Sequence, residues 1–261
     1  MTEETVLVRR DGPIGVITFN RPKVLNLFNL QVVTRLEQHL EDLEGDAQVR
    51  AIIITGAGEA AFVGGADVAE LNSRGALRHF FDFSEAVHRV YRAIELGDKP
   101  TICAVNGAAV AAGLELLLAT DIRIAAEHAR FSLPEINVGL FPAGGGSQRL
   151  MRQIAPCKAR ELMFLGDRIS ATEALALGLV NKVVGKDELM DTAMTVARRI
   201  AEKSPLALKM LKRTMATGTE MPISSALAHE RAMSSLVFDS ADAHEGCNAF
   251  LEKRTPTFLG R

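Results

Sequence analysis

Two glutamates, Glu115 and Glu135, lie inside runs that are otherwise apolar. Leu114 and the leucines at 116–118 surround Glu115, and a helix that is apolar on every side is a buried helix. Burying an ionised carboxylate without partners is costly, so folding alone gives no reason to place one there. Glu135 raises the same question between Pro134 and Ile136. Burial and mutual repulsion separate the pKa values of paired carboxylates, so such a pair can act as an acid and a base.

The alternative is that each glutamate is a structural core carboxylate. A buried carboxylate at the start of a helix is satisfied when it accepts hydrogen bonds from backbone N–H groups. Buried structural carboxylates of this kind exist in many proteins. The residues alone leave both interpretations open.

Two short segments consist of small residues, so their backbone N–H groups can approach a bound group closely. They read Gly-Gly-Ala-Asp at 64–67 and Ala-Ala-Gly at 111–113. Two N–H groups aimed at one point form an oxyanion hole, which serves any reaction in which a carbonyl becomes an enolate. The alternative is tight turns and close helix packing, which explain most glycines.

The three glycines at 144–146 precede an apparent helix, whose N-terminus favours an anion. Other catalytic signatures fail. No Gly-Lys-Ser/Thr or GxGxxG pattern is present, and Ser147 lacks the second glycine of a nucleophile elbow. His229 and His244 lack the spacing of zinc ligands. We interpret the histidines of the helix predicted at 77–96, His79 and His88, as surface or core-edge residues.

Composition limits the possible partners. The 261 residues are 48% hydrophobic and 24% charged, with a net charge of −2 and no basic block. These values predict a folded protein with a sizeable core, and they argue against nucleic acid or an anionic membrane as partner.

Three scattered cysteines fit a reducing compartment. The apolar stretch 102–119 contains Asn106 and Glu115, which argues against a membrane span, and the acidic N-terminal segment shows no secretory signal. We therefore expect a cytoplasmic protein.

Periodicity predicts a mixed body followed by helices. A β-hairpin is expected at 6–10 and 14–19, and a strand–turn–helix unit at 101–120. The remaining expected strands are 50–55, 121–125 and 180–184, and the remaining helices are 30–43, 77–96, 157–165, 171–177, 187–203, 205–216, 222–238 and 241–252. We therefore predict an α/β fold, with a core domain over 1–200 and a helical subdomain over 201–261.

At these residues the sequence resembles the enoyl-CoA hydratase/isomerase (crotonase) superfamily. The resemblance runs from Asn-Arg-Pro-Lys at 20–23 to Phe-Leu-Glu-Lys-Arg at 250–254. It is most specific in Ala-Val-Asn-Gly at 104–107, Glu115, Asp121, Pro-Glu at 134–135 and Gly-Gly-Gly-Ser-Gln-Arg-Leu at 144–150. So many spaced matches identify the family better than any single glycine motif.

The resemblance implies a crotonase-like spiral of ββα units with a C-terminal helical trimerisation region, assembled as a homotrimer or a dimer of trimers. It also implies an acyl-CoA substrate and a thioester enolate stabilised by the backbone N–H groups of Ala66 and Ala112. Glu115 matches the base that activates water, and Glu135 the group that holds the water and supplies or removes the C2 proton. The Ala143 N–H matches a group that positions the water. No metal or cofactor is implied, because coenzyme A is part of the substrate.

The resemblance also places the coenzyme A contacts. They are Lys23, Val24, Leu25, Gly64, Ala66, Asp67 and Val68, with Phe250 and Lys253 reaching a neighbouring subunit's ligand. Asp67 is expected to cap a helix. Alanine stands at 111, 112 and 143, where glycine is frequent in the family, and alanine resists a positive φ. Together with Val24 in place of a smaller residue, these departures bear on acyl selectivity. The phenylalanines at 80, 81 and 83 either border the acyl pocket or belong to a packed core, because their spacing fits both.

The combined prediction is a 2-enoyl-CoA hydratase, a hydro-lyase that forms 3-hydroxyacyl-CoA. Having both glutamates favours hydration or its reverse. The alternatives are a Δ3/Δ2 enoyl-CoA isomerase and a dehydratase of an unusual acyl group such as carnitinyl-CoA. A non-enzymatic RNA-binding role is disfavoured by the acidic net charge.

Overall fold

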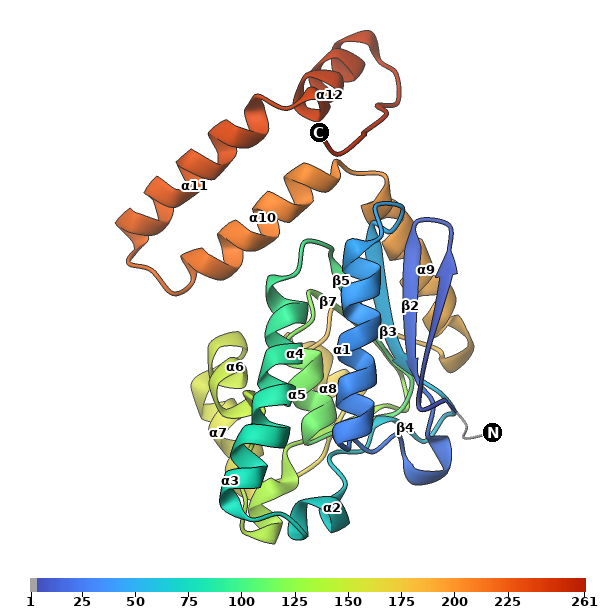
Figure 1. Cartoon of the computed structure of the whole chain (residues 1–261), viewed down its shortest axis with the longest axis vertical. Helices are drawn as coiled ribbons and strands as arrows, with labels where there is room; N and C mark the ends of the chain where they lie inside the picture. Colours follow the sequence, from blue (N-terminus) through green and yellow to red (C-terminus); the bar gives the residue numbers. More distant parts are fainter. Residues whose placement is uncertain (1–3) are drawn as a thin grey trace.

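Six strands form the main sheet of the computed structural model, which describes residues 4–261 (Figure 1). In spatial order they are β1 (Val6–Asp11), β2 (Ile14–Phe19), β3 (Ala51–Gly56), β5 (Thr101–Val105), β7 (Ile122–Ala126) and β10 (Lys182–Val184). The β1–β2 hairpin is antiparallel and every other pairing is parallel. The first three residues of the acidic N-terminal segment lie outside the described residues.

A smaller second sheet carries the candidate site. Its strands are β4 (Ala61–Val63), β6 (Ala108–Val110), β8 (Arg130–Ser132) and β9 (Ile169–Ser170), in that order. Three times a main-sheet strand is followed by a small-sheet strand and then by helical structure: β3–β4, β5–β6 and β7–β8. This succession is the expected spiral of ββα units, and it is confirmed.

Helices cover both faces of the main sheet (Figure 1). The larger core includes α1 (Leu30–Gly45), α4 (Glu85–Leu96) and α5 (Ala112–Leu118), and the smaller core includes α9 (Leu189–Ala201). The remaining body helices are α2 (Val68–Asn72), α3 (Ala76–Arg78), α6 (Gly146–Gln153), α7 (Pro156–Leu165) and α8 (Ala171–Ala176). Short 3₁₀ turns span Pro22–Val24, Pro134–Val138 and Lys186–Glu188. No helix of the described residues has the length and apolarity of a membrane span.

Three C-terminal helices project from this body (Figure 1). They are α10 (Pro205–Gly218), α11 (Ile223–Phe238) and α12 (Ala241–Glu252). Lys212 of α10 is buried at the joint, where its Nζ donates to the carbonyl oxygens of Ile94 and Lys99 and to Asp121 Oδ2 at 2.7 Å. Because these partners are fixed at the ends of α4, β5 and β7, they fix α10 relative to the core.

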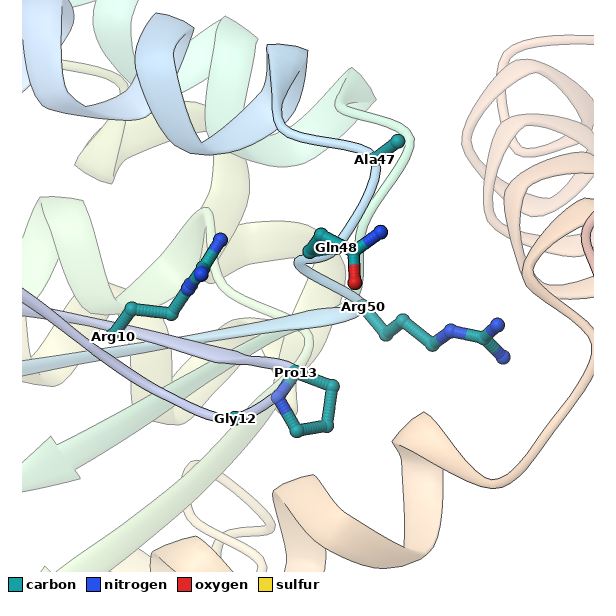
Figure 2. A pocket seen from close by; sticks show the side chains of 6 residues that line it. All are labelled: Arg10, Gly12, Pro13, Ala47, Gln48 and Arg50. Carbon is teal, nitrogen blue, oxygen red and sulfur yellow. The ribbon is translucent and has the colours of Figure 1, made fainter.

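A second joint lies beside a surface pocket (Figure 2). The pocket is lined by Arg10, Gly12, Pro13, Ala47, Gln48 and Arg50. Arg50 points away from the sheet, and its Nη2 donates to the Phe258 carbonyl oxygen at 2.9 Å. Arg10 pairs with Asp46 at 2.7 Å. Both guanidinium groups therefore already have partners, and Arg50 connects the core with the end of the chain.

The predicted elements are present with shifted ends, and three differences matter. The small second sheet was not predicted, because its strands are too short for an alternating pattern. The helix predicted over 77–96 is α3, a π-helical segment over His79–Ser84, and α4. No element is predicted directly after the strand at 121–125, where the structure has β8 and the 3₁₀ turn that carries Glu135. All three differences lie beside the candidate site.

Candidate active site

Glu115 lies in the first turn of α5 and is 5% exposed. Its Oε1 accepts hydrogen bonds from the N–H groups of Gly144 at 2.8 Å and Gly146 at 2.9 Å. Gly146 is the first residue of α6, so the anion at this helix N-terminus is the Glu115 carboxylate. Oε2 has no hydrogen-bond partner among the described residues. The two interpretations of Glu115 are therefore compatible, since one oxygen caps a helix and the other is unpaired.

The glycines around α6 permit this close approach. A Cβ at Gly144 would lie 2.5 Å from Glu115 Oε2, and a Cβ at Gly146 would lie 2.9 Å from Oε1. Gly145 has a φ of +105°, which L side chains rarely adopt. Side chains at these positions would therefore displace the carboxylate.

Glu135 lies in the 3₁₀ turn after β8 and is half-buried. Its Oε2 is buried and has no hydrogen-bond partner within the part of the chain that the structure describes. Burial, together with the negative charge of Glu115, raises the pKa of Glu135 to about 7. Burial also raises the pKa of Glu115, while the N–H groups of Gly146 and Gly144 and the charge of Arg149 oppose that rise. The structure thus brings the two carboxylates within electrostatic reach of each other.

Two backbone N–H groups lie on adjoining segments beside this pair. Strands β4 and β6 are parallel, and a Cβ on Gly65 would lie 3.4 Å from the Ala111 Cβ. Ala66 and Ala112 directly follow these two residues. The Ala112 N–H opens α5 and has no acceptor inside that helix. Within residues 4–261, the Ala66 N–H likewise has no hydrogen-bond acceptor. The arrangement supplies two donors without internal partners.

Strain falls on Ala111 rather than on Ala112. Ala111 has a φ of 49° and a ψ of −118°, whereas Ala112 is helical. Such a conformation costs an alanine roughly 1–3 kcal/mol. It is fixed on both sides, because the Ala111 N–H donates to the Ser132 carbonyl oxygen at 2.9 Å and its own carbonyl accepts from the Glu115 N–H at 3.0 Å. The alanine at 112 therefore keeps its N–H in an ordinary backbone conformation.

The segment before α6 is held to α4. Ala143 is exposed, and its carbonyl oxygen accepts a hydrogen bond from His88 Nε2 at 2.7 Å. His88 is exposed as predicted, and it also contacts the site. Arg149 Nη1 donates to the Gly144 carbonyl oxygen at 3.3 Å, and Arg149 pairs with Glu95 of α4 at 2.9 Å.

Two residues near the site were not singled out from the sequence. Tyr91 is fully buried, and its hydroxyl donates to the Ala112 carbonyl oxygen at 2.7 Å. Arg149 carries the positive charge that acts on Glu115. Tyr91 is the only tyrosine in the chain, and Arg149 follows the glycines by three residues. These features of the sequence draw attention to the two residues, but neither feature identifies the group that the side chain contacts.

The residues expected to bind coenzyme A divide into two groups. Val24, Leu25 and Val68 are exposed, and the Leu25 carbonyl oxygen accepts the Gly64 N–H at 2.8 Å. Lys23 is exposed beside them, and Asp67 caps α2 by accepting the N–H groups of residues 69 and 70, which confirms its predicted cap.

Phe250 and Lys253 form the second group. Both are exposed on α12 and its C-cap. Figure 1 places α12 at the opposite end of the molecule from α2. A single chain therefore does not bring these two residues to the site.

Known proteins share this sequence and fold. The enoyl-CoA hydratase/isomerase family model matches residues 9–261. The chain is 39% identical to the short-chain-enoyl-CoA hydratase of Clostridium acetobutylicum, covering 97% of each, and 37% identical to the crotonyl-CoA hydratase of Syntrophomonas wolfei over the full length of both. The crystal structure of an enoyl-CoA hydratase from Bacillus anthracis superposes with a TM-score of 0.95 at 34% identity, covering 99% of this chain and 100% of that one. The chain belongs to the enoyl-CoA hydratase/isomerase family.

Proposed function

We propose that this protein is a 2-enoyl-CoA hydratase, which reversibly adds water across the C2=C3 bond to give a 3-hydroxyacyl-CoA. One observation carries the proposal: the buried carboxylate of Glu115 and the half-buried carboxylate of Glu135 lie near a pair of backbone N–H groups without internal acceptors. A hydratase needs an acid, a base and an oxyanion site. The hydratase names of the full-length relatives support the same reaction.

Each group has a defined step. The thioester oxygen accepts hydrogen bonds from the N–H groups of Ala66 and Ala112. Glu115 Oε2 takes a proton from water as the water oxygen bonds to C3, and the electrons of the C2=C3 bond move onto the thioester as an enolate. The enolate collapses as Glu135, which has held the water, gives its proton to C2. The Ala143 N–H orients the water, and each oxyanion donor lowers the barrier by about 3 kcal/mol.

The surrounding residues bind coenzyme A and hold the subunits together. Lys23, Val24, Leu25, Gly64, Asp67 and Val68 hold coenzyme A, which is part of the substrate, and no metal or other cofactor takes part. The helical subdomain over 201–261 forms a cytoplasmic homotrimer or hexamer, supported by exposed apolar side chains on its helices: Leu211, Met215, Ile223, Leu227, Leu236 and Phe238. Phe250 and Lys253 then contact a neighbouring subunit's ligand. Sedimentation analysis measures the assembly.

The test is the loss of enoyl-thioester absorbance when enzyme is added to crotonyl-CoA, with longer, branched and cyclic enoyl-CoAs in parallel. We expect turnover of at least one member, giving a 3-hydroxyacyl-CoA identified by mass. A folded protein that binds coenzyme A but hydrates none of them would overturn the proposal. Conversion of a 3-enoyl-CoA to its 2-enoyl isomer without hydration would assign the isomerase activity instead.

The pH dependence of kcat/KM follows from the two carboxylates. Hydration requires ionised Glu115 and protonated Glu135. Activity should therefore fall as the pH rises above about 7, where Glu135 loses its proton. It should also fall as the pH drops through the raised pKa of Glu115, where that base becomes protonated. Initial rates between pH 4.5 and 9.5 measure both limbs.

Dehydration provides the control. Dehydration also requires that Glu115 and Glu135 carry one proton between them. The overall reaction neither releases nor consumes a proton. Its kcat/KM profile should therefore superimpose on that of hydration. A hydration profile that stays flat above pH 7 would contradict the role of Glu135 as proton donor.

A further inference from the structure

The peptide between Ala143 and Gly144 links an exposed side chain with Glu115. Its N–H, on Gly144, donates to Glu115 Oε1 at 2.8 Å, and its C=O, on Ala143, accepts from His88 Nε2 at 2.7 Å. The imidazole nitrogen must be the donor, because a carbonyl oxygen only accepts. Hydrogen bonds at the two ends of one peptide polarise each other, so a donor on the carbonyl makes the N–H a stronger donor.

We propose that His88 is a positioning residue that stabilises ionised Glu115 through the Ala143–Gly144 peptide. This inference rests on the proposed function, in which Glu115 is the base. His88 does not touch the reacting atoms. It acts on Glu115 through one peptide group.

Helix α4 holds His88 in a fixed position relative to the site. Tyr91 and Glu95 lie three and seven residues further along, so the three side chains share one face of the helix. Tyr91 holds the Ala112 carbonyl oxygen at 2.7 Å, and Glu95 holds Arg149, which donates to the Gly144 carbonyl oxygen. The same helix face therefore contacts both the oxyanion turn and the loop that holds Glu115, and His88 contributes one of these contacts.

His88 is suited to a clean test because it is exposed on the surface of α4. Replacing it removes no core packing. Two variants separate the donor from the side chain: His88→Ala removes the donor, and His88→Gln keeps an N–H donor of similar reach. Arg92→Gln is the matched control, because Arg92 is exposed on the next turn of α4 and forms no side-chain hydrogen bond or ion pair among the described residues.

Hydration kinetics give the first measurement. We expect His88→Ala to lower kcat by about tenfold, the size of one typical hydrogen bond, with a smaller change in KM. Its acidic limb of kcat/KM should move to higher pH, because ionised Glu115 loses stabilisation. His88→Gln and Arg92→Gln should stay within about twofold of the parent enzyme by the same reasoning. An unshifted acidic limb in His88→Ala, or a His88→Gln variant as impaired as His88→Ala, would overturn the proposal.

A titration without substrate separates this proposal from the hydratase assignment. The carboxyl stretching band of Glu115 is identified in infrared difference spectra as the band that Glu115→Gln lacks. Its midpoint should move to higher pH in His88→Ala and stay in place in Arg92→Gln. Such a shift supports the link even if no enoyl-CoA is hydrated. Identical midpoints in parent and His88→Ala would refute it even in an active hydratase.

Discussion

Replacing Glu115 by glutamine is expected to lower kcat for hydration by about 10³-fold, within the range of about 10²–10⁴ typical of a lost general base. The amide still offers an oxygen to the N–H groups of Gly144 and Gly146, which now bond to Oε1. The cap of α6 is therefore retained while the basicity is lost. The decrease is measured as initial rates of crotonyl-CoA hydration near pH 7, with substrate binding followed separately by calorimetry.

Glu127→Gln is the control for this variant, because Glu127 is exposed and its side chain forms no hydrogen bond in the part of the chain that the structure describes. The parent enzyme and both variants should unfold at similar temperatures. Hydration by Glu115→Gln at near-parental rate would remove Glu115 from its role. Glu135→Gln should also be slow, because C2 then lacks its proton donor.

The second large effect is expected from Gly113→Ala. A Cβ at position 113 would lie 2.2 Å from the Val63 carbonyl oxygen and 2.8 Å from the Val63 Cβ. The backbones of β4 and α5 must then separate. Ala112 precedes the substituted residue and Ala66 follows Val63 closely, so the two proposed oxyanion donors would move relative to each other. Because one misplaced donor costs about 10²–10³ in kcat, we expect a loss of at least about 10²-fold.

Gly45→Ala is the matched substitution, because a Cβ there meets no atom within 4 Å. It should leave kcat and the melting temperature unchanged. Gly113→Ala should melt earlier, and any folded fraction should bind product normally but turn over slowly. A stable Gly113→Ala enzyme with parental kcat would show that this contact does not set the donor geometry.

How far the site could be predicted differs from residue to residue. Glu115 was found because a carboxylate among leucines is unusual, and the glycines before α6 were read correctly as an anion site. The sequence does not show that these two observations describe a single contact. Gly144 and Glu115 are far apart in the chain, and only the tertiary fold brings them together at 2.8 Å.

The supporting residues could not be predicted for a related reason. His88, Tyr91 and Arg149 form hydrogen bonds with backbone carbonyl oxygens, which carry no residue-specific signal. A histidine on an exposed helix face is usually a surface residue, and that expectation describes its exposure correctly while missing its contact. The short strands β4 and β6 were missed because three residues cannot display a period. The roles assigned to Glu115, Glu135, Ala66, Ala112, Ala143 and the coenzyme A contacts stay predictions.

The π-helical segment at His79–Ser84 has a consequence for how such an enzyme diversifies. It carries Phe80 and Phe81, each 60% exposed, outside both sheets. The segments that carry Ala66 and Ala112, the proposed oxyanion donors, instead follow paired strands, where a change of register would displace both N–H groups. Irregular helical turns tolerate insertions and new side chains that strand ends do not. Side chains of the His79–Ser84 segment can therefore change without altering the strand register that positions Ala66 and Ala112.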